Sequence, residues 1–275
     1  MAVIQDDLVL NDRYSRVLRD YINNLNRASR AARGGANSNR LYGNSAANAA
    51  RQTSGLVSTL RNLAGAFISI QGVKSLVSLS DEMASIRARL NMMNDGLQTT
   101  EELNQMIYES AQRSRGAYQE TANFVAQLGN LAGSAFSSTS EIVAFAEQIN
   151  KQITLSGASA SAASAAILQL TQGLSSGALR GEELNSVLEQ TPMIAQSIAD
   201  YLGVSTGEMR ERASEGALTA SVVKNAIFAA ADEINAKFEQ MPMTWAQVWT
   251  TMKNTAIQAL EPVLDAVNWA ANNIR

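Results

Sequence analysis

The sequence predicts an all-α fold: a multi-helix domain with long amphipathic helices and a C-terminal helix that leads into an extended rod. Apolar residues recur at steps of three and four along most of the chain, and no stretch alternates with period two for long enough to form a sheet. Signals for helix starts recur between these stretches. The chain is 46% hydrophobic but only 5% aromatic, so small side chains supply much of its core and let helices approach closely.

Several short patterns mark where helices begin and end. Three pairs match the capping box, in which a Ser or Thr and a Glu three residues later satisfy two free N–H groups reciprocally: Thr99 with Glu102, Ser138 with Glu141, and Ser205 with Glu208. Further N-caps are expected at Ser80, Thr191 (before Pro192) and Thr219. Helix ends or turns are expected at Gly177, Gly181, Gly203 and Gly216.

Four segments follow from these patterns. Residues 1–33 form an amphipathic segment whose apolar face comprises Tyr14, Val17, Tyr21, Leu25 and Ala28. Residues 34–54 are rich in Gly, Asn, Ser and Ala and are expected to be a linker. Residues 55–243 form the helical domain, and residues 244–275 form an amphipathic helix at the start of the extended region.

A heptad stripe opens the helical domain. Its apolar residues are Leu56, Leu60, Leu63, Phe67 and Ile70, with Val77 on the same seam and Lys74 interrupting it. Two interpretations remain open. The stripe forms a coiled-coil contact with other copies or neighbouring helices, or it is one face of a helix packed inside its own domain.

Charge is distributed unevenly along the chain. The net charge is −3, yet nine arginines lie between Arg13 and Arg61, and no acidic residue lies between Asp20 and Asp81. This basic stretch is either a solvated linker face or a surface that contacts an acidic partner.

Composition excludes several kinds of chemistry. The chain has no Cys and no His, which removes thiol nucleophiles, Cys or His zinc sites and imidazole bases. Four carboxylate pairs stand out: Asp81–Glu82, Glu101–Glu102, Glu182–Glu183 and Asp232–Glu233. The first three are expected in opening turns of helices, where free N–H groups favour negative charge without any active site. We predict a protein that is not an enzyme and binds no cofactor or metal.

Neither a secretory signal nor a membrane span is predicted. The N-terminus lacks an apolar core segment, and the most hydrophobic stretch, residues 62–73, is shorter than the roughly 20 residues that cross a bilayer.

Residues Ser197 to Glu215 have the pattern of a helix-turn-helix, with a turn at Gly203 and a second helix that carries Arg210 and Arg212. A DNA-binding regulator is therefore the alternative function. Against it, the second helix also carries three glutamates, and acidic groups are repelled by the phosphate backbone. The same turn can join any two helices packed at an angle.

A longer pattern, from Ser175 to Val267, resembles the N-terminal region of tape measure proteins from long-tailed bacteriophages and prophages. The matching features are a Leu-Arg-Gly-Glu-Glu-Leu start, a Pro-opened helix, a Leu-Gly-Val turn, an Ala-Ser-Glu-Gly corner and a Trp-x-x-x-Trp pair. They fall on Leu179, Arg180, Gly181, Glu182, Glu183 and Leu184, on Pro192, on Leu202, Gly203 and Val204, on residues 213–216, and on Trp245 and Trp249.

This resemblance implies a structural virion protein that sets tail length during assembly, occupies the lumen of the tail tube and assists DNA ejection. The implied partners are other copies of the chain, the tail tube protein, tail-tip (distal tail or hub) proteins and tail assembly chaperones. No specific nucleic acid is implied, and the host membrane would be met only through regions outside this chain. The implied location is the host cytoplasm during assembly and then the tail lumen.

Two further expectations concern the length and the last helix. Members of this family are usually longer and often carry apolar spanning segments downstream, so an N-terminal portion of a longer protein is expected, with a short relative or a truncated remnant as alternatives. A muralytic enzyme is a third candidate function, because long members sometimes carry such domains. The packing face of the last helix is expected to comprise Trp245, Trp249, Met252, Ile257 and Leu260.

Overall fold

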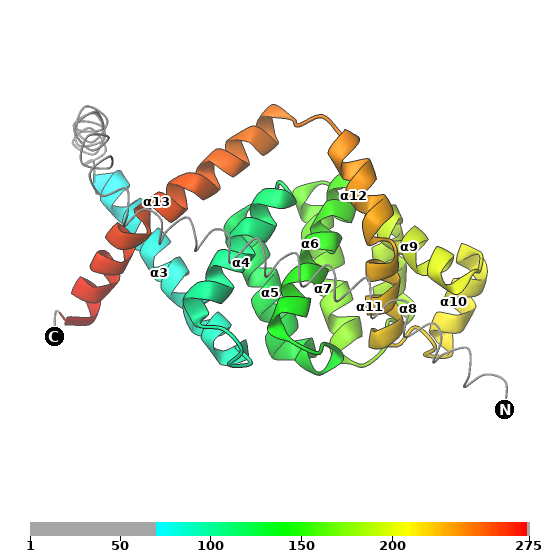
Figure 1. The fold of residues 1–275 in the computed structure, drawn as a ribbon. Coiled ribbons are helices and arrows are strands. Elements are labelled where there is room, and N and C mark those ends of the chain that lie inside the picture. The colour runs from blue at the N-terminus through cyan, green and yellow to red at the C-terminus, as the bar shows by residue number, and fades with distance from the viewer. Residues whose placement is uncertain (1–69, 274–275) are drawn as a thin grey trace, which may run out of the picture. The chain divides into compact units, whose positions relative to one another are not determined.

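The computed structural model describes residues 70–273, which form α-helices, one short 3-10 helix and no strand (Figure 1). The predicted all-α class is confirmed. The helices are α3 (Ile70–Met93), α4 (Thr100–Arg113), α5 (Tyr118–Ala132), η1 (Gly133–Ala135), α6 (Thr139–Leu155), α7 (Ala160–Ser175), α8 (Gly181–Gln190), α9 (Pro192–Leu202), α10 (Thr206–Ser214), α11 (Ala220–Ala229), α12 (Ala231–Gln240) and α13 (Trp245–Asn273).

Several predictions lie outside the described residues: the segments 1–33 and 34–54, and the stripe residues Leu56, Leu60, Leu63 and Phe67. Ile70 is the first residue of α3, but its side chain is not described. Val77 lies in α3 and is exposed. The coiled-coil role of the stripe stays a prediction, as does the extended rod after α13.

The described residues fall into two compact units. One comprises residues 86–256, and the other comprises residues 70–85 together with 257–273. In the smaller unit, the buried Ser80 hydroxyl donates a 2.7 Å hydrogen bond to the carbonyl oxygen of Leu264, and Met83, Ile257 and Leu264 are buried.

Helix α6 is the centre of the larger unit. It packs against α4, α5, α9, α11 and α12, and Figure 1 shows it among these helices. From Thr139 to Ile153, every residue of α6 except Asn150 is buried. A helix that is enclosed on all sides requires small or apolar side chains for close packing, and any charge on it requires a partner.

Local sequence signals predicted several helix ends correctly. Thr99 with Glu102 and Ser205 with Glu208 form complete capping boxes, and Thr219 accepts the N–H of Val222. Gly203 ends α9 in the left-handed conformation (φ +64°), which glycine adopts without the clash that a Cβ would cause.

The third capping box forms only in part. The Ser138 hydroxyl accepts the N–H of Glu141, as predicted. The Glu141 carboxylate, however, accepts the N–H of Ser137 rather than that of Ser138.

One predicted N-cap is wrong. Ser80 lies inside α3, where its hydroxyl bonds the Leu264 carbonyl, and Asp81–Glu82 therefore lies in mid-helix rather than in an opening turn. Thr191 is the N-cap residue of α9, as predicted, but its side chain makes no capping bond, since its hydroxyl donates to the Val187 carbonyl at 2.9 Å.

Candidate functional site

Two separate parts of the family pattern meet in space. The Leu179 N–H donates to the Leu218 carbonyl at 2.8 Å, and the Ala220 N–H donates to the Gly177 carbonyl at 2.9 Å. We call this pairing of residues 177–180 with 216–220 the clasp. It joins the end of α7 to the start of α11, so segments about 40 residues apart in sequence hold the three intervening helices, α8, α9 and α10, as one closed loop.

Two glycines make the clasp possible. A Cβ on Gly173 would lie 2.6 Å from Cδ1 of the fully buried Leu179, so only glycine lets Leu179 pack against α7. A Cβ on Gly216 would lie 2.6 Å from Nη2 of Arg180, and Gly216 has φ +75°. The Leu-Arg step and the Ala-Ser-Glu-Gly corner are thus complementary halves of one contact.

Other residues of the pattern lie in α8 and α9 or at their ends. Gly181 begins α8, Leu184 is buried and Glu183 is half-buried, whereas the side chain of Glu182 is not described. Pro192 is the first residue of α9. Leu202 and Gly203 end that helix, and the Val204 N–H donates to the Ala199 carbonyl at 3.1 Å.

The predicted succession of helix, turn and helix is present in α9, Gly203 and α10. Within α10, Met209 and Ala213 are buried against the domain. The exposed positions alternate in sign, with Arg210 and Arg212 beside Glu208 and Glu211. This outer face offers no continuous basic surface.

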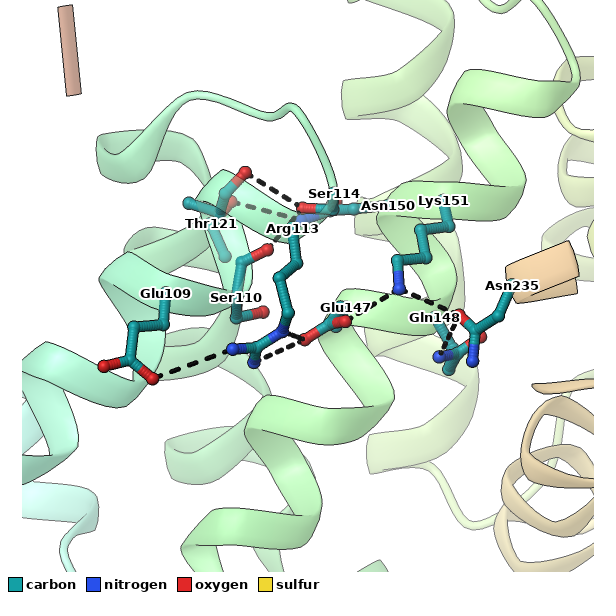
Figure 2. Close-up of polar contacts among 11 residues, drawn as sticks. Glu109, Ser110, Arg113, Ser114, Thr121, Glu147, Gln148, Asn150, Lys151 and Asn235 are labelled. Atoms are coloured by element: carbon teal, nitrogen blue, oxygen red, sulfur yellow. Dashed lines mark hydrogen bonds and ion pairs between the residues drawn. The ribbon is translucent and has the colours of Figure 1, made fainter. Parts of the chain in front are cut away.

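The interior of the larger unit contains a network of charges that the sequence patterns did not predict (Figure 2). Glu147 on α6 is 1% exposed; its Oε2 atom accepts from Nε and Nη2 of Arg113 on α4, at 3.1 and 2.8 Å. Its Oε1 atom lies 2.8 Å from Nζ of Lys151, which also donates to Oδ1 of Asn235 on α12 at 2.8 Å. The network therefore connects α4, α6 and α12.

The cations determine the ionisation of Glu147. Burial raises the pKa of this carboxyl, but the Coulombic attraction of Arg113 and Lys151 and their hydrogen bonds outweigh burial and hold the pKa below its ordinary value. A second buried pair, Glu141 with Lys224 at 3.0 Å, connects α6 to α11. Both pairs fix which helices α6 contacts.

Asp95, in the loop before α4, is another residue that sequence reasoning missed. Its carboxylate accepts the Thr139 N–H at 2.7 Å and the Leu97 N–H at 3.0 Å. Partial burial raises the pKa of Asp95, but these backbone hydrogen bonds outweigh it and lower the pKa. Asp95 therefore stabilises the start of α6 from a loop that is distant in sequence. No local spacing of residues predicts this contact.

The first half of α13 attaches to the larger unit through a polar residue. Asn254 is 1% exposed; its amide donates to the Gly116 carbonyl and its oxygen accepts the Tyr118 N–H, both at 2.8 Å. Trp245 and Trp249, by contrast, are 88% and 71% exposed.

The predicted packing face of α13 therefore does not pack against the rest of the described chain. Trp245, Trp249, Met252 and Leu260 are exposed, and only Ile257 is buried. The four exposed side chains follow the outer positions of the helix, whereas Asn254 faces the domain. Self-association through Trp245 and Trp249 stays a prediction.

Three of the four carboxylate pairs lie at the start of a helix. Glu101–Glu102 lies in the opening turn of α4 as predicted, Glu182–Glu183 lies at the start of α8, and Asp232–Glu233 occupies the first turn of α12. Between residues 70 and 273, no three acidic side chains cluster as metal ligands do. Over the same range, no helix combines the length and apolar character needed to cross a bilayer.

Comparison with known proteins gives one family. The family model described as tape measure protein matches residues 74–264, a range that contains the clasp, the α9–α10 turn and the charged network. Neither the curated proteins nor the solved structures give a significant match.

Proposed function

Because the chain belongs to the tape measure protein family, we propose that it sets tail length during phage tail assembly, lies in the lumen of the tail tube and assists DNA ejection. The family is one of structural tail proteins. The match over residues 74–264 carries the proposal, since it covers most of the chain, including both halves of the clasp.

We propose that the described domain is the part that meets other tail components, and that length is measured by helix beyond it. A helix rises about 1.5 Å per residue, so a ruler must be an extended segment rather than a compact bundle. The proposed partners are other copies of the chain, the tail tube protein, tail-tip proteins and tail assembly chaperones. The exposed Trp245 and Trp249 are the proposed contact with other copies.

In-frame insertions after residue 273, in the phage or prophage that encodes the chain, test the ruler. Two helix-forming inserts, one twice the length of the other, are expected to lengthen the tails in the ratio of the inserts, by about 1.5 Å per added residue. Electron micrographs of assembled tails measure this. Unchanged tail length with both inserts would contradict the proposal.

The helix, turn and helix order of α9 and α10 is also that of a DNA reader, which is the competing function. We propose instead that this turn packs helices, because its outer face mixes Arg210 and Arg212 with glutamates. A mobility-shift measurement with duplex DNA at low salt is expected to show no complex. A salt-sensitive shift that is lost on Arg210→Ala would favour the regulator.

A muralytic activity is the third candidate, and nothing among the described residues favours it. Incubation of the chain with purified peptidoglycan is expected to release no soluble fragments. Release that is abolished by replacing one carboxylate pair would overturn this expectation.

A further inference from the structure

The corner between α4 and α5 contains a strained residue. Among residues 70–273, Arg115 is the one residue other than glycine with a positive φ, at +56°. Its N–H donates to the Gln112 carbonyl at 3.2 Å, and the next N–H, of Gly116, donates back to α4. Arg115 therefore occupies the position that glycine usually takes at a helix end. A side chain there costs free energy because its Cβ lies too close to the backbone, so a contact of the side chain is expected to offset the cost.

The guanidinium of Arg115 makes such a contact with the end of α12. Its Nη1 atom donates to the Met241 carbonyl at 2.8 Å, and its Nη2 atom donates to the Phe238 carbonyl at 3.4 Å. Its Cζ atom also lies 4.5 Å from the centroid of the Phe238 ring. A cation is favoured at a helix C-terminus, where carbonyl groups lack partners within the helix. Arg115 therefore fixes the point at which the chain leaves α12.

The same corner holds the first part of α13, residues 245–256, which we call the arm. Asn254 is the one buried residue of the arm, so no apolar side chain of the arm lies in the interior. The hydrogen bonds that attach the arm are those of Asn254 to Gly116 and Tyr118, and those of the Gln112 amide to the Thr251 carbonyl (3.3 Å) and the Thr255 hydroxyl (3.1 Å). A segment with few buried apolar contacts opens at a lower free energy than the core.

The link between α12 and the arm separates the two helices. Pro242 lacks an N–H and does not fit inside a continuous helix. The Thr244 hydroxyl accepts the N–H of Gln247 at 3.2 Å, and the Gln247 side chain accepts the N–H of Thr244 at 3.0 Å. This capping box starts the helix of the arm independently of α12.

We propose that the arm opens and closes on a folded domain, with residues 241–244 as its hinge. Arg115 keeps the end of α12 in place while the hydrogen bonds of Asn254 break and form again. A partner that binds the open arm more tightly than the closed arm shifts this equilibrium toward the open state. The proposal does not depend on the tape measure role.

Distances between two spin labels test the opening, because the chain has no cysteine of its own. One label is attached at Ala256→Cys, at the end of the arm, and the other at Ser164→Cys on α7; both positions are exposed. The parent chain is expected to give one main distance, since minor states are commonly about 0.1–10% populated. Asn254→Ala removes two hydrogen bonds, so the ratio of open to closed arm is expected to rise about 5–30-fold and a second, longer distance to appear.

Two further variants separate opening from a general loss of structure. Lys253→Ala, an exposed change beside Asn254, is the control and is expected to keep the parent distance. Gln112→Ala, which removes hydrogen bonds from the domain side, is expected to increase the longer distance as Asn254→Ala does, but to a smaller extent. Parent-like distances in both Asn254→Ala and Gln112→Ala would overturn the proposal.

The position of the hinge is tested at the end of α12. Labels at the exposed Glu239→Cys and at Ser164→Cys are expected to keep one distance in Asn254→Ala, because Arg115 still holds α12. Arg115→Gly relieves the strain but removes the guanidinium, and is expected to broaden this distance. A second distance for Glu239 in Asn254→Ala would show that opening is not confined to the arm, and an unchanged distance in Arg115→Gly would overturn the role of Arg115.

Discussion

Helix α6 buries charged side chains, whereas helix α13 exposes large apolar ones. Glu147 on α6 is 1% exposed, whereas Trp245 on α13 is 88% exposed. Within the larger unit, a few charged side chains are thus buried while two large aromatic rings stay exposed. Buried charges fix which helices pack together, since an unpaired one is costly, whereas exposed aromatic rings suit contact with another protein.

The same comparison can be made between two ion pairs of identical spacing. Glu147 with Lys151 and Glu233 with Lys237 are both i,i+4 pairs, at 2.8 and 2.6 Å. The first pair is buried and Glu147 also binds Arg113, whereas the side chains of Glu233 and Lys237 are 65% and 50% exposed. The two pairs therefore compare a buried charge network with a solvated ion pair of the same spacing.

The largest effect is expected from Glu147→Ala. Removal of this carboxylate leaves the buried Lys151 without an anionic partner, and the free energy of unfolding is expected to fall by about 3–5 kcal/mol. The matched change Glu233→Ala is expected to cost at most about 0.5 kcal/mol, because its pair is solvated. Urea denaturation measures both. Equal costs would contradict the role assigned to burial.

Asn254→Ala is expected to have the next largest effect. The substitution leaves the Gly116 carbonyl and the Tyr118 N–H without their partner, and each such loss costs about 1–3 kcal/mol. Limited proteolysis and thermal melts are expected to show α13 released first. If the variant is as stable as the parent chain, Asn254 does not hold this helix.

The pH dependence of stability sharpens the comparison further. The pKa of Glu147 is lower in the folded chain than its ordinary value of 4.5. The unfolded chain therefore takes up a proton first, and the stability that Glu147 contributes is complete above about pH 4.5 and is lost as pH falls through the folded pKa.

In denaturation measured below pH 4.5, the parent chain is thus expected to lose stability more steeply than Glu147→Gln. The difference in slope is at most about 1.4 kcal/mol per pH unit, the limit for one proton. Parallel pH profiles would show that Glu147 does not stabilise the fold through its charge.

Local chemistry explains which features the sequence could predict. Thr99 and Ser205 cap helices because their partners lie three residues away, and Gly203 ends α9 because glycine adopts the left-handed conformation most readily. Ser80 and Thr191 have the same residue types, but the hydroxyl of each bonds a carbonyl, and for Ser80 that carbonyl is 184 residues away. Propensity gives no information about such distant partners.

The candidate sites show the same division. The family pattern was visible in sequence, but the contact between Leu179 and Leu218 was not, because it depends on how three intervening helices pack. Glu147 and Lys151 have a spacing that is ordinary on a solvated helix. Their burial follows only from the enclosure of α6 by five neighbouring helices. Trp249 is exposed because Asn254 fixes the opposite face of α13 to the domain.

The smallest effect on stability is expected from Trp249→Ala. In a core, this change costs about 3–5 kcal/mol, but Trp249 is 71% exposed, so the free energy of unfolding is expected to change by no more than about 0.5 kcal/mol. Lys253→Ala, an exposed change on the same helix, is the control. Analytical ultracentrifugation is expected to show weaker self-association for Trp249→Ala only. A large loss of stability would place Trp249 in a core. An unchanged oligomer would remove the proposed contact between copies. Only a stable fold together with weaker association fits a helix that Asn254 fixes to the domain and whose tryptophans contact a partner.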